Sequence, residues 1–208
     1  MIAIIDYGVG NLRSVQKGLE KVGQQAKISQ DPEELRKADG VVLPGVGAFA
    51  DAMKSLDQRG LTGVIKEIAL SGKPFLGICL GMQLLFEDSE EGESIPGLAL
   101  LKGRVRRLPP GLKVPHMGWN QVEINTPSPL LKDIDNYAAF YFVHSYYVDP
   151  VETDTVTTWT DYGLKFASII SRQNIFGIQF HPEKSSNLGL QILKNFGELI
   201  GNAHPSSN

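Results

Sequence analysis

The sequence predicts an α/β fold: an open, mixed and mainly parallel sheet with helices on both faces, and additional antiparallel strands in the second half. Over about the first 88 residues, short apolar runs alternate with amphipathic stretches, which is the pattern of parallel strands joined by helices. From about residue 100 to 180, threonine, valine and aromatic residues gather in short segments, which is typical of strands joined by hairpins.

The composition limits the class of protein. The chain has 208 residues, 42% of them hydrophobic, and a net charge of −3, which suits one compact domain. So mild a charge argues against nucleic acid or an anionic membrane as a partner. The single cysteine, Cys79, offers neither a disulfide nor a thiolate cluster, so we expect a reducing location and no metal or other cofactor. The N-terminus lacks a basic leader and no stretch approaches the ~20 apolar residues of a membrane span, which favours a cytoplasmic protein.

The first half contains three short apolar runs that we expect to be buried parallel strands. A glycine-rich turn follows the first of them, and Asn11 is placed to cap the next helix, which Gly23 ends. Asp31 and Pro32 supply a cap and a first helical residue for another helix. The expected strands are 2–5, 40–43 and 74–78, and the expected helices are 12–22, one from 32, 49–58, 62–71 and one over 81–86.

The second half begins with residues 87–97, which contain five acids and a proline and which we expect to be an exposed loop without chemistry. Segments 151–160, 166–171 and 175–180 are expected strands, and an amphipathic helix over 187–200 closes the chain. We therefore expect a single domain over residues 1–200 and a polar, frayed tail over 201–208.

The segment Gly77-Ile78-Cys79-Leu80-Gly81 stands where an expected strand becomes a helix, and it has the nucleophile-elbow pattern with cysteine in the serine position. So sharp a turn leaves no room for a side chain at either glycine. The first N–H groups and the positive dipole of the following helix favour a thiolate and an oxyanion. A buried structural cysteine is the commoner role for this residue type, but the flanking glycines and the context favour a nucleophile.

A cysteine nucleophile needs a base, and His181 ends the apolar run 175–180, where open α/β sheets deliver catalytic groups. Glu183 lies two residues further, so in an extended segment its carboxylate shares a face with the imidazole and can orient it. A surface histidine beside a carboxylate is the alternative. Together with the elbow, the pair predicts a catalytic triad of Cys79, His181 and Glu183.

The oxyanion that such a triad generates needs backbone donors. One is expected from the N–H of Leu80, directly after the nucleophile. A second is expected from the loop Pro44-Gly45-Val46-Gly47, which follows the strand ending at Leu43, and there from Val46 or Gly47. A plain turn at the end of a strand explains that loop about equally well.

These motifs resemble those of the class I, or triad, glutamine amidotransferases. That family carries Gly-x-Cys-x-Gly-x-Gln and a downstream His-Pro-Glu, which residues 77–83 and 181–183 match. The resemblance reaches to about residue 200, so it covers the whole expected domain but not the polar tail. Four further segments extend it: 6–11, 44–49, 115–120 and 141–146.

The resemblance implies a glutaminase that passes ammonia to a cyclase subunit, itself a (β/α)8 barrel, as a heterodimer in histidine biosynthesis. Cys79 would form a thioester, His181 would protonate the departing ammonia and then activate water, and Glu183 would hold His181. The resemblance also implies control at residues 45–47, where a peptide flip would present an N–H to the oxyanion.

The resemblance further implies two sets of binding residues. Glutamine is expected around Gly45, Gln83, His144, Ser145 and Tyr146, and the cyclase is expected to contact Asn11, Trp119, Tyr141 and Lys184. For Trp119 and Tyr141, packing in the core is the alternative that composition favours. Lys184 would ordinarily be a solvated surface charge.

Three other functions compete with this interpretation. A stand-alone cysteine hydrolase of the α/β-hydrolase kind also uses an elbow, but there the acid precedes the histidine, whereas Glu183 follows His181. A non-catalytic binding module would be expected to have lost Cys79, His181 or a flanking glycine. An anthranilate synthase glutaminase usually has Gly-His-Gln after the elbow, where this chain has Gly81-Met82-Gln83.

Overall fold

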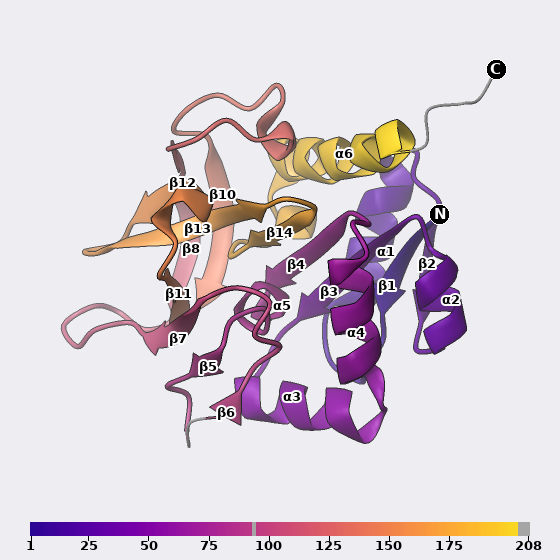
Figure 1. The fold of residues 1–208 in the computed structure, drawn as a ribbon. Helices are drawn as coiled ribbons and strands as arrows, with labels where there is room; N and C mark the ends of the chain where they lie inside the picture. Colours follow the sequence, from indigo (N-terminus) through magenta and orange to yellow (C-terminus); the bar gives the residue numbers. More distant parts are fainter. Residues whose placement is uncertain (93–94, 204–208) are drawn as a thin grey trace.

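The computed structural model describes residues 1–92 and 95–203 (Figure 1). Its main sheet is mixed, in the order β2-β1-β3-β4-β14-β13-β12-β9. The five strands from β2 to β14 are mutually parallel, and β13, β12 and β9 continue the sheet antiparallel. These strands are β1 (Ile2–Ile5), β2 (Ala26–Ser29), β3 (Gly40–Gly45), β4 (Phe75–Cys79), β9 (Glu123–Ile124), β12 (Val156–Asp161), β13 (Lys165–Arg172) and β14 (Ile175–Ile178).

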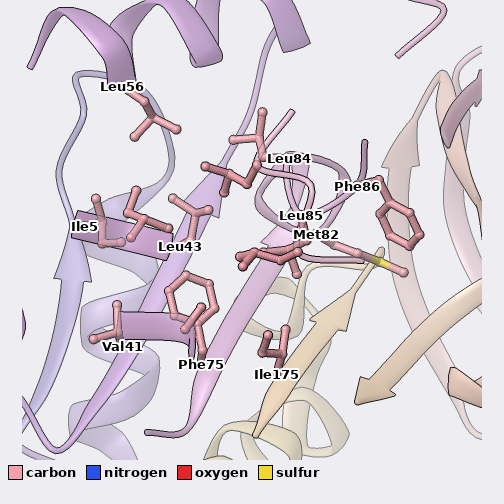
Figure 2. Packing of buried hydrophobic residues seen from close by; sticks show 14 of the residues in the cluster. Ile5, Val41, Leu43, Leu56, Phe75, Met82, Leu84, Leu85, Phe86 and Ile175 are labelled. Atoms are coloured by element: carbon pink, nitrogen blue, oxygen red, sulfur yellow. The ribbon is translucent and has the colours of Figure 1, made fainter. Parts of the chain in front are cut away.

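Helices cover both faces of the parallel strands (Figure 1). Alternate residues of a strand point to opposite faces, so Ile4 packs toward one set of helices and Ile5 toward the other. On one face lie α1 (Leu12–Lys21) and α6 (Ser186–Ala203), and on the other lie α2 (Pro32–Lys37), α3 (Phe49–Gln58) and α4 (Leu61–Leu70). In Figure 2, Ile5, Leu43 and Phe75 of the sheet form one cluster with Leu56 of α3. These two buried layers fix the parallel strands whose ends carry the site.

Two smaller sheets stand beside the main one (Figure 1). A four-stranded sheet has the order β11-β7-β5-β6, and a two-stranded sheet pairs β10 with β8. Their strands are β5 (Asp88–Ser89), β6 (Ile95–Pro96), β7 (Gly103–Arg107), β8 (His116–Gln121), β10 (Ala139–His144) and β11 (Tyr146–Pro150). The short helices are α5 (Leu80–Gln83), η1 (Pro129–Leu131), η2 (Thr153–Thr155) and η3 (Pro182–Lys184). The fold is therefore the mixed α/β architecture that the sequence predicts.

The prediction of an exposed loop over 87–97 is wrong, because part of this segment forms β5 and β6. Its acids face arginines of β7. Asp88 accepts two hydrogen bonds from Arg104, at 2.9 and 3.0 Å, and Glu90 forms an ion pair with Arg106 at 3.3 Å. Because arginines of β7, distant in the sequence, neutralise these acids, part of the acidic segment can form strands.

The strand expected over 151–160 begins later, at Val156. Val151 is 70% exposed, and η2 turns the chain before the strand starts. The Thr155 hydroxyl donates to the Glu152 carbonyl at 2.6 Å and stabilises this turn. Threonine and valine favour strands, but a local hydrogen bond from a threonine side chain competes with the ladder.

The C-terminal helix α6 runs from Ser186 to Ala203, three residues beyond the expected end. The tail expected to fray from residue 201 is therefore helical as far as residue 203, and its remainder lies outside the described residues. The division into a domain over 1–200 and a tail stays a prediction. Among the described residues, no helix is both long enough and apolar enough to cross a bilayer.

Candidate active site

Cys79 occupies the sharp turn that the elbow motif predicts. It is the last residue of β4, with φ 54° and ψ −111°, a conformation that L-residues rarely adopt. A Cβ on Gly77 would lie 2.7 Å from the Gly81 carbonyl oxygen, and a Cβ on Gly81 would overlap the Leu43 carbonyl. The expectation that neither glycine tolerates a side chain is confirmed. The strained turn leaves Cys79 lining a cavity.

The helix after the elbow is shorter than predicted. The sequence favours a helix over residues 81–86, but α5 ends at Gln83. The next carbonyls bond to an incoming segment instead, with Leu98 N–H donating to Leu84 at 2.8 Å and Leu100 N–H to Leu85 at 2.9 Å. A helix of four residues has little macrodipole, so local N–H groups such as that of Leu80, rather than a dipole, remain to stabilise negative charge.

His181 reaches the site from the neighbouring strand. β14 lies beside β4 with Ile178 opposite Ile78, so residues just beyond the two strand ends are close together. The backbone N–H of His181 donates to the Tyr141 carbonyl at 2.9 Å. Its Nδ1–H donates to Oε1 of Glu183 at 2.9 Å, with the side chains of both residues at least 98% buried. The carboxylate thus fixes the tautomer that leaves Nε2 free for proton transfer.

The pKa of His181 is shifted by its surroundings. Burial alone lowers it, but the Cys79 thiol and the Glu183 carboxylate outweigh burial and raise the pKa to about 10. His181 Nε2 interacts with the thiol without the geometry of a regular hydrogen bond, and it has no other partner among the described residues. The imidazole therefore carries a proton at neutral pH that it can donate to a leaving group.

Asn11 does not cap α1 as expected. It precedes the helix, but its side chain makes no capping hydrogen bond, and its Nδ2 donates instead to Oε1 of Glu183 at 3.4 Å. A hydrogen bond from an amide to a carboxylate is charge-assisted, and it orients the Asn11 side chain toward Glu183. A residue predicted to face a partner thus also touches the proposed triad.

The cavity at the strand ends has a volume of about 460 Å³. It brings together most of the residues that the sequence singles out, while Glu183 lies behind His181 and Gly45 lies behind the wall. Trp119 and Tyr141 are outside it. Its lining is formed by Val46, Gly47, Cys79, Leu80, Gln83, Glu91, Pro115, Val143, His144, Ser145, Tyr146, His181 and Lys184.

Gly45 is part of β3, which runs two residues beyond the expected end at Leu43 and pairs Gly45 with Cys79. A Cβ on Gly45 would lie 2.6 Å from the Tyr7 hydroxyl and 2.9 Å from Cβ of Leu80. The Tyr7 hydroxyl donates to the Pro44 carbonyl at 2.8 Å, and burial, with the nearby Cys79, raises the pKa of Tyr7. The strand end is therefore anchored as far as Gly45.

The next two residues are less constrained. Val46 is 41% exposed, and Gly47 has φ 98° with open space where a Cβ would stand. Only glycine adopts such a backbone conformation readily. Val46 and Gly47 are thus less tightly packed than Gly45, and both line the cavity.

Gln83 and Gln179 form a buried pair beneath Cys79. The Gln83 amide donates to the Tyr146 carbonyl at 2.9 Å and to Oε1 of Gln179 at 3.1 Å. The Gln179 amide in turn donates to Sγ of Cys79 at 3.7 Å. Sequence reasoning missed Gln179, although its position two residues before His181 on an extended segment was a usable signal.

His144 is buried beside the cavity and is held in a hydrogen-bonded pair with His116. His144 Nδ1 donates to the Tyr146 carbonyl, His116 Nδ1 donates to His144 Nε2, and both distances are 2.9 Å. Burial lowers the pKa of His144 to about 3 and that of His116 to about 4. Both rings are neutral at physiological pH, so His144 lines the cavity and His116 supports it without adding charge.

Glu91 is a second residue that sequence reasoning missed, because its segment was expected to be a loop without chemistry. Its Oε2 accepts a hydrogen bond from the Phe49 N–H at the start of α3, at 2.7 Å, and its side chain lines the cavity. Lys184, on η3, lines the same cavity. Besides the proposed triad, the cavity wall thus includes the carboxylate of Glu91 and the ammonium group of Lys184.

The aromatic residues predicted to face a partner lie on the small β8–β10 sheet. Trp119 pairs with Tyr141 across the strands, and their rings meet edge to face at 6.2 Å. Trp119 is 56% exposed and Met117 is 61% exposed, so packing in the core does not account for Trp119. Met117 and Trp119 are two residues apart on β8, so they expose their side chains on the same face of the strand.

In the part of the chain that the structure describes, no three His, Cys, Asp or Glu side chains are grouped so as to hold a metal ion.

Comparison with known proteins identifies the class of this protein. Residues 3–199 match the family model of glutamine amidotransferase class-I. Two solved structures share the fold over 97% of this chain: PurLQS from Thermotoga maritima (TM-score 0.75, 19% identity, 97% of that chain) and the glutaminase domain of Trypanosoma brucei CTPS (0.71, 18%, 93%). The chain belongs to the class I glutamine amidotransferases, and it is an enzyme of that family.

Curated relatives narrow the family further. The chain is 59% identical to the imidazole glycerol phosphate synthase subunit HisH of Moorella thermoacetica, over 97% of this chain and 96% of the relative. It is 58% identical to the subunit of the same name from Methanosarcina acetivorans, over 95% and 98% of the two chains. Within the class, the protein belongs to the HisH family of imidazole glycerol phosphate synthase subunits.

Proposed function

We propose that this chain hydrolyses glutamine to glutamate and ammonia by covalent catalysis at Cys79. The observation that carries the proposal is the meeting of an elbow cysteine with a buried His181–Glu183 pair at the wall of one cavity. A nucleophile, a base and a group that orients the base are the parts that acyl transfer requires.

The cavity suits a small zwitterionic amide such as glutamine. Its volume of about 460 Å³ lies within the usual range for small-molecule sites. The Glu91 carboxylate is the acceptor available for the substrate's ammonium group, and Ser145, Tyr146 and Gln83 offer polar groups around the rest of the molecule. Opposite charge inside a partly desolvated cavity favours a substrate with a free α-amino group.

The chemistry follows from the residues. The Cys79 thiolate attacks the side-chain carboxamide carbon, and the resulting oxyanion is stabilised by the N–H of Leu80 and by one from Val46 or Gly47. His181 donates its proton to the amide nitrogen and the C–N bond breaks. Ammonia departs, and a γ-glutamyl thioester remains on Cys79. Neutral His181 then takes a proton from water, the hydroxide attacks the thioester, and glutamate is released as the thiolate reforms. Glu183 holds His181 throughout.

Control of this reaction is proposed to lie in the loop after β3. Because Gly45 is anchored by Tyr7 and Leu80 while Gly47 stands in open space, a flip of the Val46 region would switch a carbonyl for an N–H at the oxyanion. One missing oxyanion donor costs about 10²–10³ in kcat. The free chain should therefore be a poor glutaminase.

The relatives' name describes subunits of a synthase, and we propose that this chain likewise assembles with a cyclase of (β/α)8-barrel fold, as a heterodimer of histidine biosynthesis in the cytoplasm. The cyclase would use the ammonia to form imidazole glycerol phosphate and AICAR. The apolar Met117–Trp119 surface supports a docking site, with Asn11, Tyr141 and Lys184 nearby. Residues 1–200 form the single domain in this proposal.

The experiment uses the chain purified with its matching cyclase. Cys79→Ala and Cys79→Ser should abolish glutamine-dependent formation of imidazole glycerol phosphate while partner binding persists. Ammonium salt should still support the cyclase reaction in the same variant complex, because external ammonia bypasses the damaged site. Retention of most glutaminase activity by either variant would overturn the proposal.

A further inference from the structure

Gln179 lies directly beyond β14 and is fully buried. Its backbone N–H donates to the Ser168 carbonyl at 2.9 Å, so its position is fixed by the adjoining strand. Its side chain reaches under the elbow, where its Nε2 stands 3.7 Å from Sγ of Cys79. A distance of this size is normal for a hydrogen bond to sulfur, so Gln179 contacts the proposed nucleophile.

The direction of this hydrogen bond is determined by its neighbours. The Tyr146 carbonyl can only accept, so the group of Gln83 that faces it must be the NH₂. That same NH₂ donates to Gln179, so the atom of Gln179 that faces Gln83 must be the carbonyl oxygen. The remaining group of Gln179, the NH₂, therefore faces the sulfur as a donor.

A second contact of the sulfur acts in the opposite sense. The Cys79 thiol is 3.9 Å from the Val143 carbonyl, to which only the protonated thiol can donate. A carbonyl favours the thiol, whereas an amide N–H favours the thiolate. The balance between the two contacts sets how readily Cys79 ionises next to His181.

We propose that Gln179 holds the Cys79 thiolate by donating a hydrogen bond to the sulfur, independently of the proton held by His181. The inference rests on the proposed role of Cys79 as nucleophile. The polar chain from Tyr146 through Gln83 also connects this donor to the cavity wall at which glutamine is expected. Gln179 thus couples the shape of the substrate site to the reactivity of the nucleophile.

The test exploits the fact that Cys79 is the only cysteine of the chain. Alkylation by iodoacetamide reports its thiolate directly, and the rate is measured from pH 5 to pH 10 on the free chain and on its complex with the cyclase. Other ionisable groups near the sulfur or lining the cavity are His181, Glu183, Tyr7, His144, Tyr146, Glu91 and Lys184, and all are kept in the variants compared.

Two variants remove the donor in different ways. Gln179→Met has a similar shape but no polar groups, and Gln179→Glu keeps an oxygen for the Gln83 amide while losing the N–H that faces sulfur. We expect alkylation at pH 7 to slow on the order of tenfold in each, and the midpoint of the pH curve to rise by about one unit, since hydrogen bonds to charged groups have about this strength. Gln191→Glu makes the same chemical change on α6, where the amide donates to Asn195 within the helix, and this variant should match the wild type.

The glutaminase rate of the complex is measured in parallel, with circular dichroism and thermal melting to check the fold. We expect kcat to fall in both Gln179 variants with a smaller change in KM. Folded variants with the wild-type pH curve for alkylation would overturn the inference whatever their glutaminase rate. An inactive wild-type complex would instead contradict the proposed function, and the alkylation curves would still decide the role of Gln179.

Discussion

The side-chain amide of Asn11 donates to Oε1 of Glu183 at 3.4 Å, and the same oxygen accepts the Nδ1–H of His181 at 2.9 Å. One carboxylate oxygen thus joins the turn before α1 to the proposed base. The second oxygen, Oε2, is buried and has no hydrogen-bond partner among the described residues. The orientation of Glu183 therefore depends on these two donors, one of which stands on a surface proposed to meet the cyclase.

Replacing Asn11 by alanine should remove one of the two hydrogen bonds that orient the Glu183 carboxylate. We expect kcat of the complex to fall about three- to tenfold with little change in KM for glutamine, because a typical hydrogen bond contributes about 0.5–1.5 kcal/mol and His181 still retains Glu183. Steady-state glutaminase assays at saturating cyclase measure this, and the affinity for cyclase is determined separately. A loss that disappears when more cyclase is added would mean that Asn11 acts only in assembly.

Glu183→Gln tests the origin of the raised pKa of His181. Burial lowers this pKa, Cys79 and Glu183 raise it to about 10, and removing the carboxylate should let the imidazolium lose its proton at lower pH. We expect kcat to fall by roughly 10²–10⁴ and the basic limb of the kcat/KM profile to move to lower pH. A basic limb at the same pH as in the wild type would show that Glu183 does not raise the pKa of His181.

The same pair makes a prediction about stability. The folded-state pKa of His181 lies above the unfolded value of about 6.5, so the interaction stabilises the fold fully below about pH 6.5 and is lost as pH rises through about 10. The difference in free energy of unfolding between wild type and Glu183→Gln should therefore shrink between pH 7 and pH 10. Denaturant titrations at several pH values measure it.

Glu91→Gln separates two roles of one carboxylate. The variant keeps an oxygen that can accept from the Phe49 N–H, so α3 should stay intact, but it loses the charge proposed to bind the substrate ammonium. We expect KM for glutamine to rise about tenfold or more with an unchanged melting temperature. Glu91→Ala should in addition lose stability. An unchanged KM in Glu91→Gln would remove Glu91 from the substrate site.

Gly81→Ala should disrupt the elbow, because the added Cβ would overlap the Leu43 carbonyl on the neighbouring strand. We expect an insoluble chain, or a folded one without glutaminase activity. Gly63→Ala is the matched control: Gly63 lies within α4 and has nothing within 4 Å of a Cβ. That variant should be more stable by about 0.5–1 kcal/mol. Equal thermal stability of the two variants would contradict the packing of the elbow.

The buried pair His116 and His144 predicts acid sensitivity. Their pKa values in the folded chain are lowered to about 4 and about 3. Below about pH 6.5 these two histidines therefore become protonated in the unfolded chain but stay neutral in the folded chain. Their contribution to stability is present above about pH 6.5 and is lost as pH falls, by about 1.4 kcal/mol per pH unit for each proton. His116→Gln should flatten this decline between pH 7 and pH 5, as measured by denaturant unfolding. If the free energy of unfolding fell equally with pH in the wild type and in His116→Gln, this role of His116 would be excluded.

Features decided by neighbours along the chain were predictable from sequence. Asp31 caps α2 through Glu33 and Glu34 as its position predicts, and the steric demand at Gly77 and Gly81 follows from the turn itself. The two faces of the sheet follow from the apolar runs. Local rules suffice in these places because the partners lie within a few residues of one another.

Features decided by distant partners were not predictable. Asn11 has the side chain of a good cap, yet its amide donates to Glu183. Asp88 becomes a strand residue, and Glu90 pairs with Arg106, because β7 supplies arginines. In the sequence, Gln179 shares a strand face with His181, but only the fold shows that its amide meets Cys79. In each case the residue that forms the contact is far away in the sequence, so the pattern of neighbouring residues does not indicate it.

The position of β14 in the main sheet has a consequence for biosynthesis. β14 lies between β4 and β13, near the middle of the sheet, but it is the last of the described strands to leave the ribosome. Until residues 175–178 emerge, the nascent chain presents β4 as an open edge that can pair with other chains. The proposed base, His181, and its carboxylate, Glu183, follow only three and five residues after β14. A prematurely terminated chain is thus an aggregation-prone fragment with a cysteine but no base, and a cell makes the ammonia-releasing site only together with the strand that completes its sheet.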